Sequence, residues 1–150
     1  MDNNYIFQYW EAIQDGTVTV GKWIKTIYEI LVNGLKSGKW DFDEEKANKA
    51  INFIENFCHH SEGRNDLLKL ELWQKAIVSA IFGIMDKRTG YRQFREVFIV
   101  VARKNGKTLF AAAIAAYMAY IDGEYGAKVY FLAPKLDQAD LVYDAFYQIV

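Results

Sequence analysis

Hydrophobic residues recur at intervals of three and four over residues 20–35, as they do along one face of an α-helix. The spacing predicts a helix over this stretch, and Thr19 is a plausible residue to cap its first turn. We expect the apolar face to be buried, and its members are Val20, Trp23, Ile24, Ile27, Ile30 and Leu31.

The same periodicity predicts two further helices. The first opens at Asp41, which has Glu44 three residues later in a variant of the capping box. Its expected buried stripe is Ala47, Ala50, Ile51, Ile54, Phe57 and Cys58. After a predicted loop at 61–66, a third helix runs to Gly83 with an inward face of Leu70, Trp73, Ala76, Ile77, Ala80 and Ile81.

The pattern changes after residue 93. Residues 94–102 and 128–134 are short runs rich in β-branched and aromatic residues, and each predicts a strand covered on both faces. Between them lies an Ala-rich helix over about 107–121, and another helix follows Pro134. Two buried strands joined by a helix favour a parallel pair with a right-handed crossover. We therefore predict an α/β fold preceded by a helical N-terminal region.

Composition restricts the class of protein. Apolar residues make up 52% of the chain and charged residues 25%, as in ordinary soluble globular proteins. The single cysteine, Cys58, excludes a disulfide framework, and Cys58-His59-His60 is interpreted as a helix end rather than a zinc site. The longest apolar run, 109–121, is too short to span a bilayer, and no signal peptide is visible. We expect a cytosolic protein without a membrane partner.

The charge distribution is uneven. The net charge of −1 argues against a protein that simply coats DNA. Between residues 87 and 107, however, seven basic residues face a single acid, which is a local balance of +6. An anion is expected near the end of this segment, although a solvated basic face explains residues 87–95 equally well.

The basic segment leads into "ARKNGKTLF". Gly106, Lys107 and Thr108 match the end of the phosphate-binding pattern G-x-x-x-x-G-K-[ST], whereas Val101 stands where the pattern has its first glycine. Such a loop requires backbone N–H groups that point into one concavity, a following helix N-terminus, a lysine and a hydroxyl. Asn105 tolerates positive φ better than most residues. We predict a phosphate-binding loop here.

The alternative is a β-hairpin, because Asn-Gly between two apolar runs is a strong hairpin signal. A hairpin would require residues 107–120 to form a strand. That stretch is Ala-rich and poor in β-branched residues, which favours a helix.

Three stretches together, "WQKAIVSAIFG", "REVFIVVARKNGKTLFAAAIAAYMA" and "VYFLAPKLDQADLVYDA", resemble the large terminase subunit of tailed bacteriophages. The likeness covers about residues 40–150. It implies a P-loop ATPase that packages double-stranded DNA into proheads, working as a ring on the portal with a small terminase subunit in the bacterial host cytoplasm. We accordingly expect a helical region over 1–70 and the first part of the ATPase domain over 71–150, with ATP and Mg²⁺ as cofactors.

The resemblance also implies roles for individual residues. Lys107 would contact the β- and γ-phosphates, Arg103 would steady charge on the γ-phosphate, and Thr108 would help to hold Mg²⁺. Gln74 would read the adenine ring, although a solvent-facing helix residue is the plainer interpretation. The full expected nucleotide site is Gln74, Arg103, Lys104, Asn105, Gly106, Lys107 and Thr108.

Part of the expected machinery is absent from these residues. Phosphoryl transfer needs an acid at a strand end, and no apolar strand ending in Asp-Glu follows residue 108. The segment "MAYIDGE" is interpreted as the turn that ends the Ala-rich helix. Asp137-Gln138-Ala139 matches the stretch that follows the second strand in the terminase family, but we favour an ordinary helix N-terminus there. We therefore expect an incomplete ATPase, the N-terminal part of a larger protein. The alternatives are another P-loop enzyme, such as a helicase-like protein or nucleotide kinase, and a non-enzymatic prophage remnant.

Overall fold

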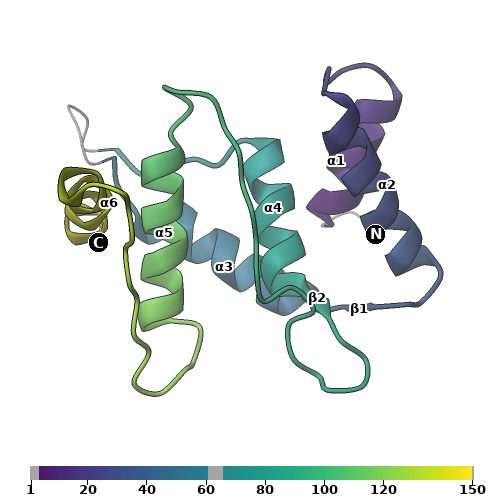
Figure 1. Cartoon of the computed structure of the whole chain (residues 1–150). Helices are drawn as coiled ribbons and strands as arrows, with labels where there is room; N and C mark the ends of the chain where they lie inside the picture. The colour runs from purple at the N-terminus through teal and green to yellow at the C-terminus, as the bar shows by residue number, and fades with distance from the viewer. Residues whose placement is uncertain (1–3, 61–65, 150) are drawn as a thin grey trace. The chain divides into compact units, whose positions relative to one another are not determined.

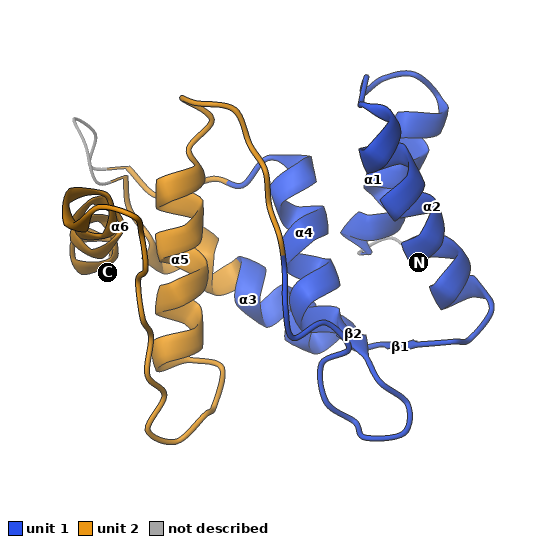
Figure 2. Cartoon of the chain, viewed as in Figure 1, with its two compact units in different colours: residues 1–51, 70–97 blue, residues 52–69, 98–150 orange. Residues whose placement is uncertain are grey.

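The computed structural model describes residues 4–60 and 66–149, which divide into two compact units (Figure 2). One unit comprises residues 1–51 and 70–97, and the other comprises 52–69 and 98–150. The described elements are α1 (Tyr5–Gln14), α2 (Lys22–Lys36), β1 (Asp41–Phe42), α3 (Glu44–Phe57), α4 (Leu72–Gly83), β2 (Ile84–Met85), α5 (Lys107–Tyr120) and α6 (Leu136–Gln148), as labelled in Figure 1.

The first unit is built on α1, which contacts both α2 and α4. Helix α1 begins where the Asn4 side-chain oxygen accepts a hydrogen bond from the Ile6 N–H at 3.0 Å. Ile6 and Tyr9 are buried, and the Tyr9 ring meets the Tyr28 ring of α2 edge to face at 4.8 Å between centroids. Because Tyr28 is buried, the pKa of its hydroxyl is raised well above the usual range.

Helix α2 lies where the sequence predicts a helix, but a different face is buried. Tyr28, Leu31 and Val32 pack inward, whereas the apolar residues expected inside, with the exception of Leu31, stay in contact with solvent. The predicted cap at Thr19 is also wrong, because the residue that precedes the helix is Gly21, and no side chain caps this end. The apolar residues of α2 cover more than half of its circumference, so periodicity alone does not select which part meets α1.

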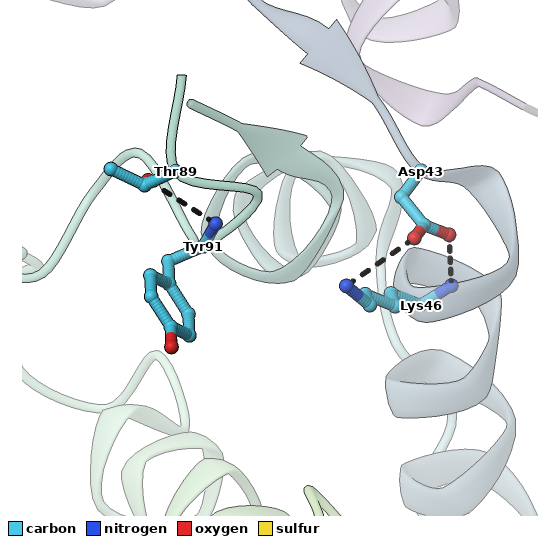
Figure 3. Close-up of polar contacts among 4 residues, drawn as sticks. All are labelled: Asp43, Lys46, Thr89 and Tyr91. Carbon is cyan, nitrogen blue, oxygen red and sulfur yellow. Dashed lines mark hydrogen bonds and ion pairs between the residues drawn. The ribbon is translucent and has the colours of Figure 1, made fainter. Parts of the chain in front are cut away.

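Helix α3 is capped by Asp43, which Figure 3 shows beside Lys46, and the predicted cap Asp41 pairs in β1 instead. The Asp43 carboxylate accepts a hydrogen bond from the Lys46 N–H at 3.0 Å, and the Lys46 ammonium lies 3.5 Å from its other oxygen. Five of the six residues of the predicted stripe are buried, and Phe57 is exposed. Residues 44–51 of α3 belong to the first unit and residues 52–57 to the second.

The strands that are present form a two-stranded antiparallel sheet in the first unit. Asp41 pairs with Met85 and Phe42 with Ile84, and the Asp43 N–H donates to the Gly83 carbonyl at 2.8 Å. The close approach leaves no room for a side chain at Gly83, since an added Cβ would lie 2.6 Å from the Phe42 ring. This sheet was not anticipated from the sequence, because both strands are too short for a period of two to be read.

The predicted parallel strands are not present in the described residues. Residues 95–100 and 128–133 run without a strand partner, and side chains expected to be buried are exposed, including Phe98 and Leu132, each at 93%. The crossover arrangement is therefore not observed, although the helix between the two segments is. A strand depends on ladder partners as well as on β-propensity, and no described segment pairs with either run.

The second unit is organised around α5, which contacts α6. The Ala-rich sequence gives α5 a nearly all-round apolar surface, and small alanines allow neighbouring segments to approach closely. Its buried residues are Phe110, Ala112, Ala113, Ala115, Ala116 and Tyr117. Phe53 packs against Tyr117 at 5.9 Å, and Phe131 packs against Phe146 of α6 at 5.7 Å, both between ring centroids.

Cys58 is completely buried in the second unit, just after α3. Its N–H donates to the Ile54 carbonyl, and its own carbonyl accepts from the Leu68 N–H at 2.7 Å. Desolvation raises the pKa of the Cys58 thiol to about 11. The thiol is thus an apolar core group, in agreement with the interpretation of Cys58-His59-His60 as a helix end.

Candidate functional site

The predicted phosphate-binding loop is a tight turn that ends at the first residue of α5. Gly106 is the residue before the helix and adopts the left-handed conformation, with φ 65° and ψ 17°. Its carbonyl already accepts a hydrogen bond from the Phe110 N–H at 2.9 Å, so the helix begins without an intervening residue. The hairpin alternative is wrong, because residues 107–120 are helical.

A second left-handed residue lies two positions earlier, at Lys104 with φ 67°. Asn105, which was expected to take positive φ, does not. Its side-chain amide instead donates to the carbonyls of Ala102 at 3.3 Å and Arg103 at 3.4 Å, and these bonds hold the turn closed. An asparagine can stabilise a turn through its side chain as well as through its backbone, and here the side chain does so.

The loop therefore alternates between left-handed and other backbone conformations just before a helix N-terminus. Alternation of this kind is typical of backbone turns whose successive N–H groups face one side, the arrangement that binds anions in other proteins. Within the described part of the chain, the N–H groups of Gly106, Lys107 and Thr108 have no hydrogen-bond acceptor. The helix adds the positive end of its dipole at the same place.

The side chains around this turn are those that an anion requires. Arg103, Lys104 and Lys107 are exposed, and Thr108 is partly buried in the first turn of α5. No acid lies between Arg103 and Tyr120, so the cations are not neutralised by a sequence neighbour. A cluster of three cations beside free backbone amides favours a polyanion over a single carboxylate.

Gln74 lies in the first unit, in the opening turn of α4. It is 9% exposed, so the interpretation as a solvent-facing residue is wrong. Its side-chain oxygen accepts a hydrogen bond from the Glu71 N–H at 2.8 Å, and the Glu71 side chain accepts from the Gln74 N–H in return. This is a capping box with glutamate in the first position, and it has a structural role by itself.

The basic segment 87–95 follows β2 in the first unit. The Lys87 ammonium lies 3.4 Å from the Asp41 carboxylate, and the Arg92 guanidinium lies over the Phe82 ring at 5.3 Å. Asp86 closes the turn by accepting from the Arg88 and Thr89 N–H groups, and the first of these bonds lowers the pKa of its carboxyl. In the same turn, Figure 3 shows the Tyr91 N–H donating to the Thr89 hydroxyl.

Other candidate features are ordinary in structure. Asp137 lies in the first turn of α6, as expected for an acid near the positive end of a helix dipole. Helix α5 ends at Tyr120, which confirms "MAYIDGE" as a helix end. Residues 4–60 and 66–149 contain no group of three or more His, Cys, Asp and Glu side chains placed to hold a metal. Within the same residues, no helix has the length and hydropathy needed to cross a bilayer.

Comparison with models of protein families gives a match. The family model described as "Terminase large subunit, ATPase domain" matches residues 72–150, which is more than half of the chain and includes both Gln74 and the loop before α5. Comparisons with curated proteins and with solved structures give no match. On the family match, which agrees with the resemblance found in the three sequence stretches, this chain belongs to the phage terminase large subunits and carries sequence of their ATP-binding, DNA-packaging ATPase domain.

Proposed function

We propose that residues 103–108 hold the triphosphate of ATP, and that nucleotide bound there drives DNA packaging. The observation that carries this proposal is the turn itself, with left-handed Lys104 and Gly106 leading straight into α5 and leaving free amides beside three cations. Because the matched family is an ATPase domain, ATP is the polyanion that we expect to bind at this loop.

Each side chain of the loop has a distinct proposed role. Lys107, in the first turn of α5, contacts the β- and γ-phosphates, and Arg103 stabilises negative charge on the γ-phosphate. Thr108 contributes its hydroxyl to Mg²⁺, which neutralises phosphate charge when it is bound. The site fits this ion, since a hydroxyl and phosphate oxygens are the hard ligands that Mg²⁺ prefers. Lys104 and Gly106 provide the two left-handed residues of the turn, and the Asn105 side chain holds the turn closed.

Gln74 is proposed as the residue that reads adenine, on the strength of the family resemblance. One side-chain oxygen is used in the capping box, while the amide N–H groups can donate to a ring nitrogen of the base. The capping box has a useful consequence, because it fixes the orientation of the amide that would make this contact.

We also propose that 94–102 and 128–134 form parallel strands of a P-loop sheet with α5 as the crossover helix, once further strands pair with them. Their β-branched and aromatic composition and their exposed apolar side chains support this proposal. The proposed division places a helical region at 1–70 and ATPase-domain sequence at 71–150. Slow amide exchange over 97–101 and 129–132 would support the sheet, whereas exchange as fast as in 122–127 would contradict it.

The proposed motor translocates double-stranded DNA. Its proposed partners are the portal protein, the small terminase subunit and further copies of the chain in a ring. The proposed location is the cytoplasm of the bacterial host. Lys87, Arg88, Arg92 and Arg95 are candidate phosphate contacts. If they act in this way, the logarithm of DNA affinity falls linearly with the logarithm of salt concentration, and reversing one of these charges lowers the slope.

The decisive experiment is calorimetric titration of the chain with ATP–Mg²⁺. Lys107→Ala should weaken binding at least about tenfold, because a charge-assisted contact to phosphate is lost. The variant should remain folded, since Lys107 is exposed and a cation is unfavourable at a helix N-terminus. Lys128→Ala, which removes an exposed lysine of the same unit, is the matched control and should bind as the original chain does. Equal affinities for the two variants would refute the proposal.

Gln74 has a test of its own. Glutamate can replace glutamine in a capping box, so Gln74→Glu keeps the acceptor for the Glu71 N–H and removes the amide donor. We expect the preference for ATP over GTP to fall by about tenfold while thermal stability changes little. An unchanged preference would assign Gln74 a structural role only.

A further inference from the structure

The exposed face of α2 is a second candidate for binding. Trp23, Ile27 and Ile30 follow one another at intervals of four and three residues, so their side chains lie on one side of the helix. They are 79%, 47% and 50% exposed. We call these three residues the α2 stripe; α2 is packed through Tyr28, Leu31 and Val32 instead.

The α2 stripe continues towards the end of the helix through Trp40. Gly34 is four residues beyond Ile30, on the same side of α2, and the Trp40 ring lies against it so closely that a Cβ there would overlap the ring. The chain is fixed in this position because the Lys39 N–H donates to the Gly34 carbonyl at 2.9 Å. Trp40 in turn packs edge to face on Phe94, with 5.5 Å between centroids.

A lysine lies over each of the two tryptophans at the ends of this surface, Trp23 and Trp40. The Lys22 ammonium is 5.7 Å from the centre of the Trp23 ring, and the Lys39 ammonium is 4.8 Å from that of Trp40. At 1.5 Å rise per residue, Lys22 and Gly34 are about 18 Å apart along α2. The surface is thus an apolar strip about three turns long with a cation at each end.

We propose that the α2 stripe is a docking site for an acidic amphipathic helix of a partner protein. Three apolar side chains of that helix, at intervals of three and four, would pack on Trp23, Ile27 and Ile30, and carboxylates about three turns apart would meet Lys22 and Lys39. Exposed tryptophan is typical of the residues that contribute most to binding. Charge complementarity selects the acidic partner.

The same two cations oppose a second copy of this chain on the α2 stripe. A second copy packed antiparallel on this face would bring Lys22 of each chain near Lys39 of the other, and a parallel copy would align like charges. Beside the stripe, Ile24 is 43% exposed, while Trp40 is held against Phe94 and is not free to insert into a bilayer; binding to a membrane surface is therefore a separate outcome of the test.

The probe is a synthetic amphipathic peptide of about 18 residues, with leucines at intervals of three and four and glutamates at both ends of the leucine face. Its partner probe carries glutamine in place of glutamate. Calorimetric titration of the chain with each peptide should show that the glutamate peptide binds at least about tenfold more tightly than the glutamine peptide. Ile27→Ser/Ile30→Ser should weaken that binding at least about tenfold, and Tyr125→Ser, which changes an exposed aromatic residue of the second unit, should not.

Charge reversal tests the two cations directly. Lys22→Glu/Lys39→Glu should weaken binding of the glutamate peptide about tenfold, whereas Lys128→Glu, which reverses an exposed lysine of the second unit, should leave it unchanged. Equal binding of both peptides, or binding that survives Ile27→Ser/Ile30→Ser, would overturn the proposal. So would sedimentation that shows a dimer abolished by Ile27→Ser/Ile30→Ser, or binding to vesicles containing phosphatidylserine with no binding of the peptide. Thermal unfolding of each variant verifies that it is folded.

Discussion

Gly106 offers the sharpest test of the loop geometry. At φ 65° and ψ 17°, an L-residue with a Cβ is strained by about 1–2 kcal/mol. A Cβ added at this position meets no atom within 4 Å, so the cost of Gly106→Ala is one of backbone conformation and not of collision. Alanine also restricts the unfolded chain more than glycine does, and this stabilises the folded state by a few tenths of a kcal/mol up to about 1 kcal/mol. The expected net destabilisation is about 1 kcal/mol.

Two controls isolate this conformational term. Gly21, before α2, also has open space around its missing Cβ, but its φ is −69°. Gly21 is, like Gly106, the N-cap of its helix, so the preference of that position for glycine over alanine is common to both variants. Gly21→Ala should therefore be less destabilising than Gly106→Ala by the conformational strain of about 1–2 kcal/mol. Asparagine visits the left-handed region more readily than alanine, so Gly106→Asn should cost less than Gly106→Ala.

Thermal unfolding followed by circular dichroism measures the difference. For a chain of this length, about 1 kcal/mol corresponds to a change of about 2–4 °C in Tm. Calorimetry should also show weaker ATP–Mg²⁺ binding by Gly106→Ala, because relaxing φ would turn the amides of Gly106 and Lys107 apart. Equal Tm values for Gly106→Ala and Gly21→Ala would refute the left-handed assignment and the anion-binding concavity that depends on it.

Three further predictions concern stability. The pKa of Cys58 is about 11 in the folded chain against 9.0 for the free side chain. The stability that the buried neutral thiol contributes is therefore complete below pH about 9 and is lost as the pH rises through about 11. Denaturant titrations across this pH range should show a smaller loss of stability in Cys58→Ala. Asp43→Ala removes the cap of α3 and the contact with Lys46, and should lower the free energy of unfolding by about 1 kcal/mol, whereas Asp43→Asn should retain most of it. Gly34→Ala should destabilise by about 1–3 kcal/mol and alter the fluorescence of Trp40, and unchanged emission together with unchanged Tm would contradict the packing described.

Several features of the chain could be predicted from local sequence because their physical causes are local. The Ala-rich run after Gly106 has strong helical propensity, which selects α5 over a hairpin. Glycine in the left-handed position before the helix follows from its freedom at positive φ. The positive φ of Lys104 was not predicted, because lysine has no local preference for it and the Asn105 side chain holds the turn from the next position.

What the sequence determined by itself was the family, the helix α5 and the composition of the loop before it. Only the tertiary structure decided which apolar face of α2 is buried, because the apolar arc of α2 is wider than its contact and Tyr28 rather than Trp23 meets Tyr9. It also decided that Phe98 and Leu132 remain exposed, since a strand forms only where another segment supplies the ladder. Periodicity and propensity are properties of one segment, whereas burial and pairing are properties of two.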